Sequence, residues 1–273
     1  MIATIRAEWR KSRSRPAFLV SSGLIASITV LAYGVSLYQA LHATPGDRHA
    51  GELLTLYPDQ FVNNVMGAAF PLGAALAIVV GALVAGSEYT WDALKTTLTQ
   101  GPGRLTTWFG RVIVFAAWML TLAVILFAVG ATSSVVVAWL QGHTIAWPVA
   151  LDVAKGVGAL WLIFSVNGAI GLALGTVIRS SAAALGVGLI YIFAVEILAV
   201  RFIDSINGGA YKWIGDLFVN QNATALTQSF TSSAFGRNLT PAINAEQAVL
   251  VLMAYLAGLV IVAAVLVRRR DVT

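Results

Sequence analysis

The feature that most constrains this chain is a series of apolar runs, each about as long as a lipid bilayer is thick. A membrane-spanning helix needs about 20 consecutive, mainly apolar residues. None of the runs alternates apolar and polar residues, as the strands of a membrane β-barrel do. We therefore expect an all-α integral membrane protein, one transmembrane domain over 1–273, with six spans at 17–38, 61–85, 112–140, 156–178, 182–200 and 248–267.

The composition excludes the other broad classes. Only 11% of the residues are charged and 58% are hydrophobic, whereas a soluble domain carries about 25% charged residues. Disorder is excluded because it goes with low hydrophobicity. The chain has no cysteine, which rules out disulfides and thiol nucleophiles. The net charge of +5 sits in short loops and tails, which favours membrane orientation over binding to nucleic acid.

The distribution of Lys and Arg predicts the orientation. Twelve of them fall in segments on one side of the six spans and five on the other. Because cytoplasmic loops carry the excess of basic residues, both termini are expected in the cytoplasm. The first run, 22 residues long, exceeds the apolar core of a signal peptide and is expected to be retained. We expect a multi-pass protein of a bacterial cytoplasmic (inner) membrane.

The N-terminal segment 1–16 has the pattern of an amphipathic helix. One stripe carries Ile2, Ile5 and Trp9, at helical spacing. A second stripe carries Arg6, Arg10 and Arg13. Such a helix is suited to lie in the cytoplasmic interface of the membrane. It could simply anchor the protein, or it could flank a docking surface for a cytoplasmic partner.

Small residues predict where the spans pack closely. They recur every fourth residue, which lets two backbones approach each other in a membrane. The pattern could serve packing within the chain or an interface between subunits. Pro71, inside the second span, is expected to kink it. The small residues are Gly73, Ala77 and Gly81 on the second span, and Gly171 and Gly175 on the fourth.

Few ionisable residues fall within the spans. Glu196 lies toward the outer end of the fifth span, where it is expected to face water and could pair with Arg201. Asp152 and Lys155, three residues apart at the start of the fourth span, can pair with each other. Buried ionisable groups would instead mark an ion-coupled transporter, and Glu196 is the one candidate.

Catalytic motifs are sparse. Two glycines, Gly81 and Gly86, have the spacing of a phosphate-binding loop, but Ser87 and Glu88 follow where the motif requires lysine. Asn167 in the fourth span is expected to hydrogen-bond between helices. The three histidines fall in outer loops as solvated side chains, although a membrane-embedded lipid-modifying enzyme could use such residues: His42, His49 and His143.

The segment 86–104, between the second and third spans, is the most informative one. Trp91, Leu94 and Leu98 fall on one face of a short helix, and Glu88, Asp92 and Lys95 on another. The sequence Gly-Pro-Gly at 101–103 then ends the helix. A short amphipathic helix held between two spans on the cytoplasmic side is suited to transmit force from a partner.

This segment resembles the signature loop of the type-2 superfamily of ABC transporter permeases. There a glutamate follows a second helix rich in small residues, a Leu-Thr run comes next, and a proline–arginine stop precedes the third helix. Asp92 and Ala93 depart from the family, which has Gly-Thr there. The matching residues are Glu88, Leu94, Lys95, Leu98, Pro102 and Arg104.

The resemblance implies a non-catalytic permease subunit of an ATP-driven exporter. Two such chains, identical or paralogous, would dock two separate ABC ATPase subunits, which would hold ATP and Mg²⁺, so this chain would carry no cofactor. The cargo would be apolar or amphipathic: lipid-like, a peptide or a drug. The ATPases would push the residues Glu88, Tyr89, Trp91, Asp92, Leu94, Lys95, Leu98 and Arg104.

The outer segment 203–244 is open to two interpretations. Its part 211–218 resembles the family's re-entrant half-helices. It could equally be an interfacial helix with Tyr211 and Trp213 in the aromatic belt. Two other functions also remain as alternatives, an ion-coupled secondary transporter and a membrane-embedded lipid-modifying enzyme.

Overall fold

The structure is a computed structural model that describes residues 2–13, 16–44, 51–90, 103–206, 211–231 and 243–269, with the backbone alone at 87–90, 104 and 231. Within these ranges all regular structure is helical. Five helical segments are long and apolar enough to cross a membrane. These are α2 (Pro16–His42), α7 (Arg104–Leu140), α8 (Ala150–Ile178), α13 (Ala245–Arg269) and the continuous segment Ser181–Ser205.

The second predicted span is broken rather than kinked. It consists of α4 (Phe61–Ala69) and α5 (Leu72–Thr90), which meet at 56° and count as a sixth span if the bent pair crosses as one. Pro71 has no backbone N–H to donate and disfavours helical backbone in the residue before it. Phe70 accordingly takes an extended conformation. The proline was predicted to kink the helix, and the break is larger than that.

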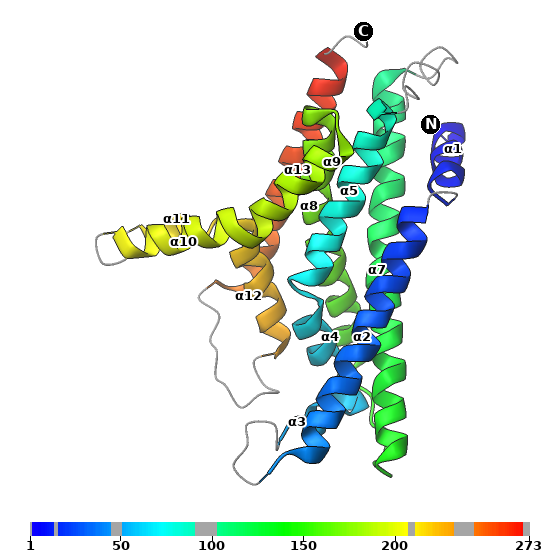
Figure 1. Ribbon diagram of the computed structural model, residues 1–273, viewed down its shortest axis with the longest axis vertical. Helices are drawn as coiled ribbons and strands as arrows, with labels where there is room; N and C mark the ends of the chain where they lie inside the picture. Colours follow the sequence, from blue (N-terminus) through cyan, green and yellow to red (C-terminus); the bar gives the residue numbers. More distant parts are fainter. Residues whose placement is uncertain are drawn as a thin grey trace.

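The helices form one bundle whose ends differ (Figure 1). The helix α1 (Ile2–Arg13) and the C-terminal end of α13 lie toward the same end. The short helices α3 (Glu52–Thr55) and η1 (Pro58–Gln60) lie toward the other. The pair α5 and α8 forms the centre, and α8 is the most buried of the candidate spans. The least buried is α13, whose apolar outer face suits a lipid environment.

The helix α7 is longer than a bilayer requires. It begins at Arg104, eight residues before the predicted start of the third span, and has 37 residues. At 1.5 Å per residue it is about 55 Å long, against a hydrocarbon core of about 30 Å. The polar residues at its start are compatible with a helix outside hydrocarbon, which hydropathy alone does not detect. The fourth span likewise starts earlier than predicted, at Ala150.

The fifth span leads into an arm that projects sideways from the bundle (Figure 1). The fifth span begins as α9 (Ser181–Ile190) and continues through the π-helical turn η2 (Tyr191–Val195). It ends as α10 (Glu196–Ser205), which belongs to the arm. The short helix α11 (Lys212–Gly215) contacts α10. The chain then turns back as α12 (Val219–Thr231), which packs against α13 and α4.

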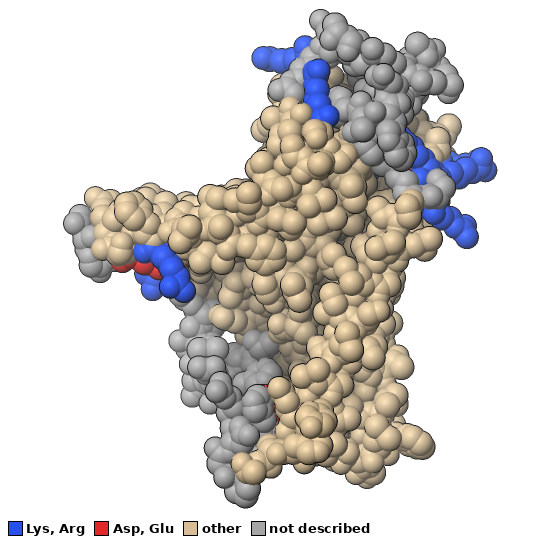
Figure 2. All heavy atoms as spheres, in the orientation of Figure 1, with Lys and Arg blue, Asp and Glu red and all other residues tan. Residues whose placement is uncertain are grey.

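The basic side chains gather on this face mainly at the end that holds α1 and the C-terminal end of α13 (Figure 2). A smaller group of charges lies on the projecting arm. On the face shown, the described residues at the opposite end carry no visible Lys or Arg. This asymmetry is the pattern that the predicted orientation requires.

Candidate functional site

Aromatic stacking holds α1 to the bundle. The ring of Trp9 stacks on Trp118 of α7 with ring centroids 5.2 Å apart. Phe18, at the start of α2, also stacks on Trp118, at 4.5 Å. Eight residues earlier on α7, a Cβ at Gly110 would lie 3.2 Å from the Cγ2 atom of Thr4. The missing side chain at Gly110 thus lets α1 lie close along α7.

The buried face of α1 is polar rather than apolar. Glu8 and Ser12 are buried against the bundle, and Lys11 forms an ion pair with Glu8 at 4.0 Å. The apolar stripe faces outward in part, since Ile2 is 77% exposed. The basic stripe is also exposed, which leaves its charges available at the surface: Arg6, Arg10 and Arg13.

The C-terminal end of α5 (Leu72–Thr90) and the start of α7, which flank the predicted coupling segment, lie at the same end of the bundle as α1 (Figure 1). Glu88 and Tyr89 lie in the last turn of α5, and Arg104 is the first residue of α7. The rest of the predicted coupling residues lie outside the part of the chain that the structure describes: Trp91, Asp92, Leu94, Lys95 and Leu98.

A buried arginine lies close to where this segment joins α7. Arg111 is only 8% exposed. Its guanidinium carbon lies 6.0 Å from the centre of the Trp108 ring, at the outer limit of a cation–π contact. Moving a cation out of water costs free energy. The burial of Arg111 therefore distinguishes this end of α7 from an ordinary solvated helix end. In the sequence, Arg111 is one of the twelve basic residues on the predicted cytoplasmic side and has no further distinguishing pattern.

The central pair α5 and α8 approaches through the predicted small residues. A Cβ at Gly81 would clash with the carbonyl oxygen of Gly168, and one at Gly171 would clash with the carbonyl oxygen of Ile78. At Gly175 a Cβ would lie 2.8 Å from the Cβ of Ala85. Backbone faces backbone here, so neither helix can shift to accept a larger side chain.

The other two small residues of α5 lie on the same packed region. A Cβ at Gly73 would come within 2.7 Å of the Phe164 ring on α8, and Ala77 is fully buried. Asn167 on α8 was expected to hydrogen-bond between helices, and this is wrong for the described residues. Its amide donates to the Ile163 carbonyl of its own helix at 2.9 Å.

Glu196 was expected to face water, and this expectation is wrong, because the residue is 1% exposed. Its carboxylate accepts a hydrogen bond from the backbone N–H of Asn220 in the first turn of α12. The Asn220 side chain donates to the Ile192 carbonyl in η2 at 3.0 Å. A carboxylate at a helix N-terminus meets unsatisfied N–H groups and the positive end of the helix dipole.

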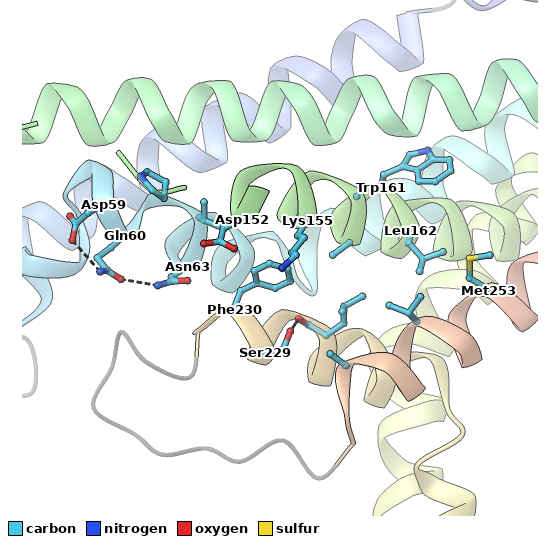
Figure 3. A pocket seen from close by; sticks show the side chains of 17 residues that line it. Asp59, Gln60, Asn63, Asp152, Lys155, Trp161, Leu162, Ser229, Phe230 and Met253 are labelled. Carbon is cyan, nitrogen blue, oxygen red and sulfur yellow. Dashed lines mark hydrogen bonds between the residues drawn. The ribbon is translucent and has the colours of Figure 1, made fainter. Parts of the chain in front are cut away.

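The predicted ion pairs are absent from the described residues, where Lys11–Glu8 is the one ion pair found. Glu196 turns toward α12 instead of toward Arg201. Asp152 and Lys155 do not pair with each other. Both instead line a groove between α4, α8, α12 and α13, together with Asp59 and Asn63 (Figure 3). Sequence analysis missed the groove because its walls come from four segments far apart in the chain.

The described histidines stack on tyrosines. The ring of His42 stacks on that of Tyr38 with centroids 4.2 Å apart. The ring of His143 stacks on that of Tyr57 with centroids 3.8 Å apart. His49 lies outside the described residues. Among the described residues no group of three His, Asp or Glu side chains could hold a metal ion.

The five or six apolar helices in the described part of the chain, packed through glycines and carrying apolar outer faces, define a multi-pass α-helical membrane protein. The chain belongs to the DUF2705 family, a family of proteins of unknown function, which matches residues 46–273. No functionally curated protein matches the chain in sequence.

Proposed function

We propose that this protein is the permease subunit of an ATP-driven ABC exporter. Two such chains, identical or paralogous, would enclose the translocation path and dock two separate ATPase subunits, which hold ATP and Mg²⁺. The cargo would be apolar or amphipathic, since the spans offer few charged groups. The membrane would be a bacterial cytoplasmic membrane with both termini in the cytoplasm.

One observation carries this proposal. The helix α1 and the ends of α5 and α7 that flank the predicted coupling segment lie at the same end of the bundle (Figure 1). That end also carries the basic residues of α1 and α13. A docking surface for a cytoplasmic partner needs these elements together, and the positive-inside rule assigns this end to the cytoplasm.

The packing supports transmission of force from that end. A push on the segment after α5 would act on a helix whose backbone lies directly against α8. A push on α1 would reach α7 through the stack of Trp9 and Trp118. Closely packed elements move as units rather than deform. Movement of these units would reshape the path between two copies of the chain.

The test is co-purification from native membranes in mild detergent, followed by an assay of ATP hydrolysis. We expect a stoichiometric partner with a phosphate-binding loop and vanadate-sensitive activity. Leu94→Asp places a charge on the predicted docking helix and should abolish co-purification. Glu88→Ala should retain the partner but lower transport per ATP hydrolysed.

Matched controls come from the opposite end of the bundle. Leu54→Asp and Glu52→Ala alter a leucine and a glutamate of α3 and should leave co-purification unchanged. Loss of the partner in both Leu94→Asp and Leu54→Asp would show general damage rather than a docking surface. A chain that purifies without any ATPase would contradict the proposal.

A second candidate, an ion-coupled secondary transporter, is favoured by the burial of Glu196 inside an apolar helical segment. Ionisable residues in such positions commonly belong to ion pathways. This candidate predicts gradient-driven transport by the purified chain alone, abolished by Glu196→Gln. The hydrogen bond from Asn220 offers a structural role for the same residue. ATP dependence of transport separates the two candidates.

A further inference from the structure

The groove between α4, α8, α12 and α13 is a second candidate site, at the end of the bundle away from α1. Its volume is about 840 Å³, within the usual range of ligand sites. Five of its polar lining residues, labelled in Figure 3, are Asp59, Gln60, Asn63, Asp152 and Lys155.

The groove is polar at one end and apolar at the other. The polar residues of η1, α4 and the first turns of α8 gather at one end, and Leu162 and Met253 lie at the other (Figure 3). Leu226 and Val249 also line the groove. A ligand with a polar head and an apolar tail matches this division.

We propose that the groove binds a zwitterionic phospholipid, with its phosphate at Lys155, its ammonium group at Asp152 and Asp59, and an acyl chain along Leu226, Val249 and Met253. This site is independent of the proposed exporter function. It requires neither an ATPase partner nor a second copy of the chain.

The charges at the polar end support a zwitterion. Lys155 forms no ion pair with any described residue, and neither Asp59 nor Asp152 does. Gln60 donates to Asp59 at 3.1 Å and Asn63 donates to Gln60 at 2.7 Å, which orders one wall of the head site. An anionic ligand would leave the two carboxylates without a cation, and a cationic one would leave Lys155 without an anion.

The direction of the groove also supports a lipid. Asp152 and Lys155 lie in the first two turns of α8, a candidate span, and Leu162 lies ten residues after Asp152. Ten residues of helix advance about 15 Å. On α13, Ala245, Val249 and Met253 form one stripe from the start of another candidate span. The groove thus runs from helix ends, where headgroups lie, toward the part of the spans that lies in hydrocarbon.

The experiment is lipid titration of the purified full-length chain in a neutral maltoside detergent, read by native mass spectrometry. The ligands are phosphatidylethanolamine, phosphatidylglycerol (phosphate without ammonium), diacylglycerol (chains without charges) and a cationic double-chain amphiphile. We expect one saturable phosphatidylethanolamine per chain, bound more tightly than the other three. Inorganic phosphate or ethanolamine alone should not displace it, because each lacks the chain.

Charge variants locate the site. Lys155→Gln should weaken phosphatidylethanolamine binding about tenfold, the effect of losing one charge-assisted contact. Asp59→Asn with Asp152→Asn should weaken it by a similar factor but leave phosphatidylglycerol unaffected or bound more tightly. The matched controls Lys212→Gln and Asp204→Asn alter the projecting arm and should change neither affinity. Val249→Trp should block the apolar end.

Equal affinity of the wild-type chain and Lys155→Gln would overturn the proposal. So would equal binding of all four ligands, which indicates lipid around the whole bundle rather than a site, or preference for the cationic amphiphile. If Lys155→Gln fails to fold, the double aspartate variant still decides, because it should weaken the binding of phosphatidylethanolamine without weakening that of phosphatidylglycerol. Failure of this titration leaves the co-purification test of the exporter function untouched, and the reverse holds too.

Discussion

The carboxylate of Glu196 accepts a hydrogen bond from the backbone N–H of Asn220, 24 residues further along the chain. The bond joins the start of α10 to the start of α12. Since Asn220 also donates to Ile192, both ends of the projecting arm are fastened to one point beside the bundle. The arm is therefore positioned by a polar contact, although it emerges from an apolar span.

Two substitutions of Glu196 should distinguish the effect of its hydrogen bond on stability from the effect of its charge. Glu196→Leu leaves the buried N–H of Asn220 without an acceptor, which costs about 1–3 kcal/mol, and should lower the thermal midpoint measured in detergent. Glu196→Gln keeps an acceptor and should cost less. Glu246→Gln, an exposed position on α13, is the control. Equal stability of Glu196→Leu and the wild type would show that the contact does not fasten the arm.

The glycines at the contact between α5 and α8 should tolerate no side chain. Gly81→Ala brings a methyl group onto the carbonyl of Gly168. Overpacking against backbone should destabilise the bundle by about 1–3 kcal/mol, read as a lower thermal midpoint. Gly258→Ala on α13, where nothing lies within 4 Å, should be neutral or slightly stabilising because alanine favours helix. The prediction fails if the two variants behave alike.

The stack on Trp118 should hold α1 in place. Trp9→Ala removes it and should speed hydrogen exchange of the α1 backbone amides, measured by mass spectrometry, while α8 keeps its protection. Trp9→Phe should behave nearly as the wild type because it can still stack. Trp213→Ala, at an exposed tryptophan on the arm, should leave α1 unchanged. Unaltered exchange in Trp9→Ala would mean that the remaining contacts of Thr4, Glu8 and Ser12 suffice.

The absence of cysteine allows a clean test of orientation. A single cysteine placed at Arg13 should react with a membrane-impermeant maleimide only after cells are opened. One placed at Gln141, just after α7 at the other end, should react in intact cells. Both positions are exposed, so access alone decides the result. The reversed pattern would place α1 on the outer side and remove the basis for a cytoplasmic docking surface.

Much of the fold could be predicted because hydropathy is a local property. The apolar runs identify the helices that could span a membrane, and the lack of an N–H at Pro71 indicates the break between α4 and α5. Local patterns could not predict the polar buried face of α1, since the burial of Glu8 and Ser12 depends on how α1 packs on the bundle, chiefly on α7. The burial of Glu196 has the same origin, because its partner lies on α12.

The two candidate sites also differ in whether a local sequence pattern reveals them. The coupling segment carries its pattern within some twenty residues and is visible in the sequence. The groove is not, because Asp59, Lys155 and Met253 come to line one groove only when η1, α8 and α13 assemble. Asp152 and Lys155 illustrate the difference. Their spacing predicts a pair, yet the two side chains form no ion pair and instead line a groove whose other walls come from other helices.

The unbroken length of α7 has a mechanical consequence. Gly110, where α1 lies against the helix, is 30 residues from its far end at Leu140, a distance of about 45 Å. If the rod pivots at Leu140, a rotation of about 5° displaces the seat of α1 by roughly 4 Å, because arc length grows with radius. Residues near the pivot would move by less than 1 Å for the same rotation, by the same geometry. In such a motion the helix would act as a lever, with large displacements at the basic end and small ones at the other.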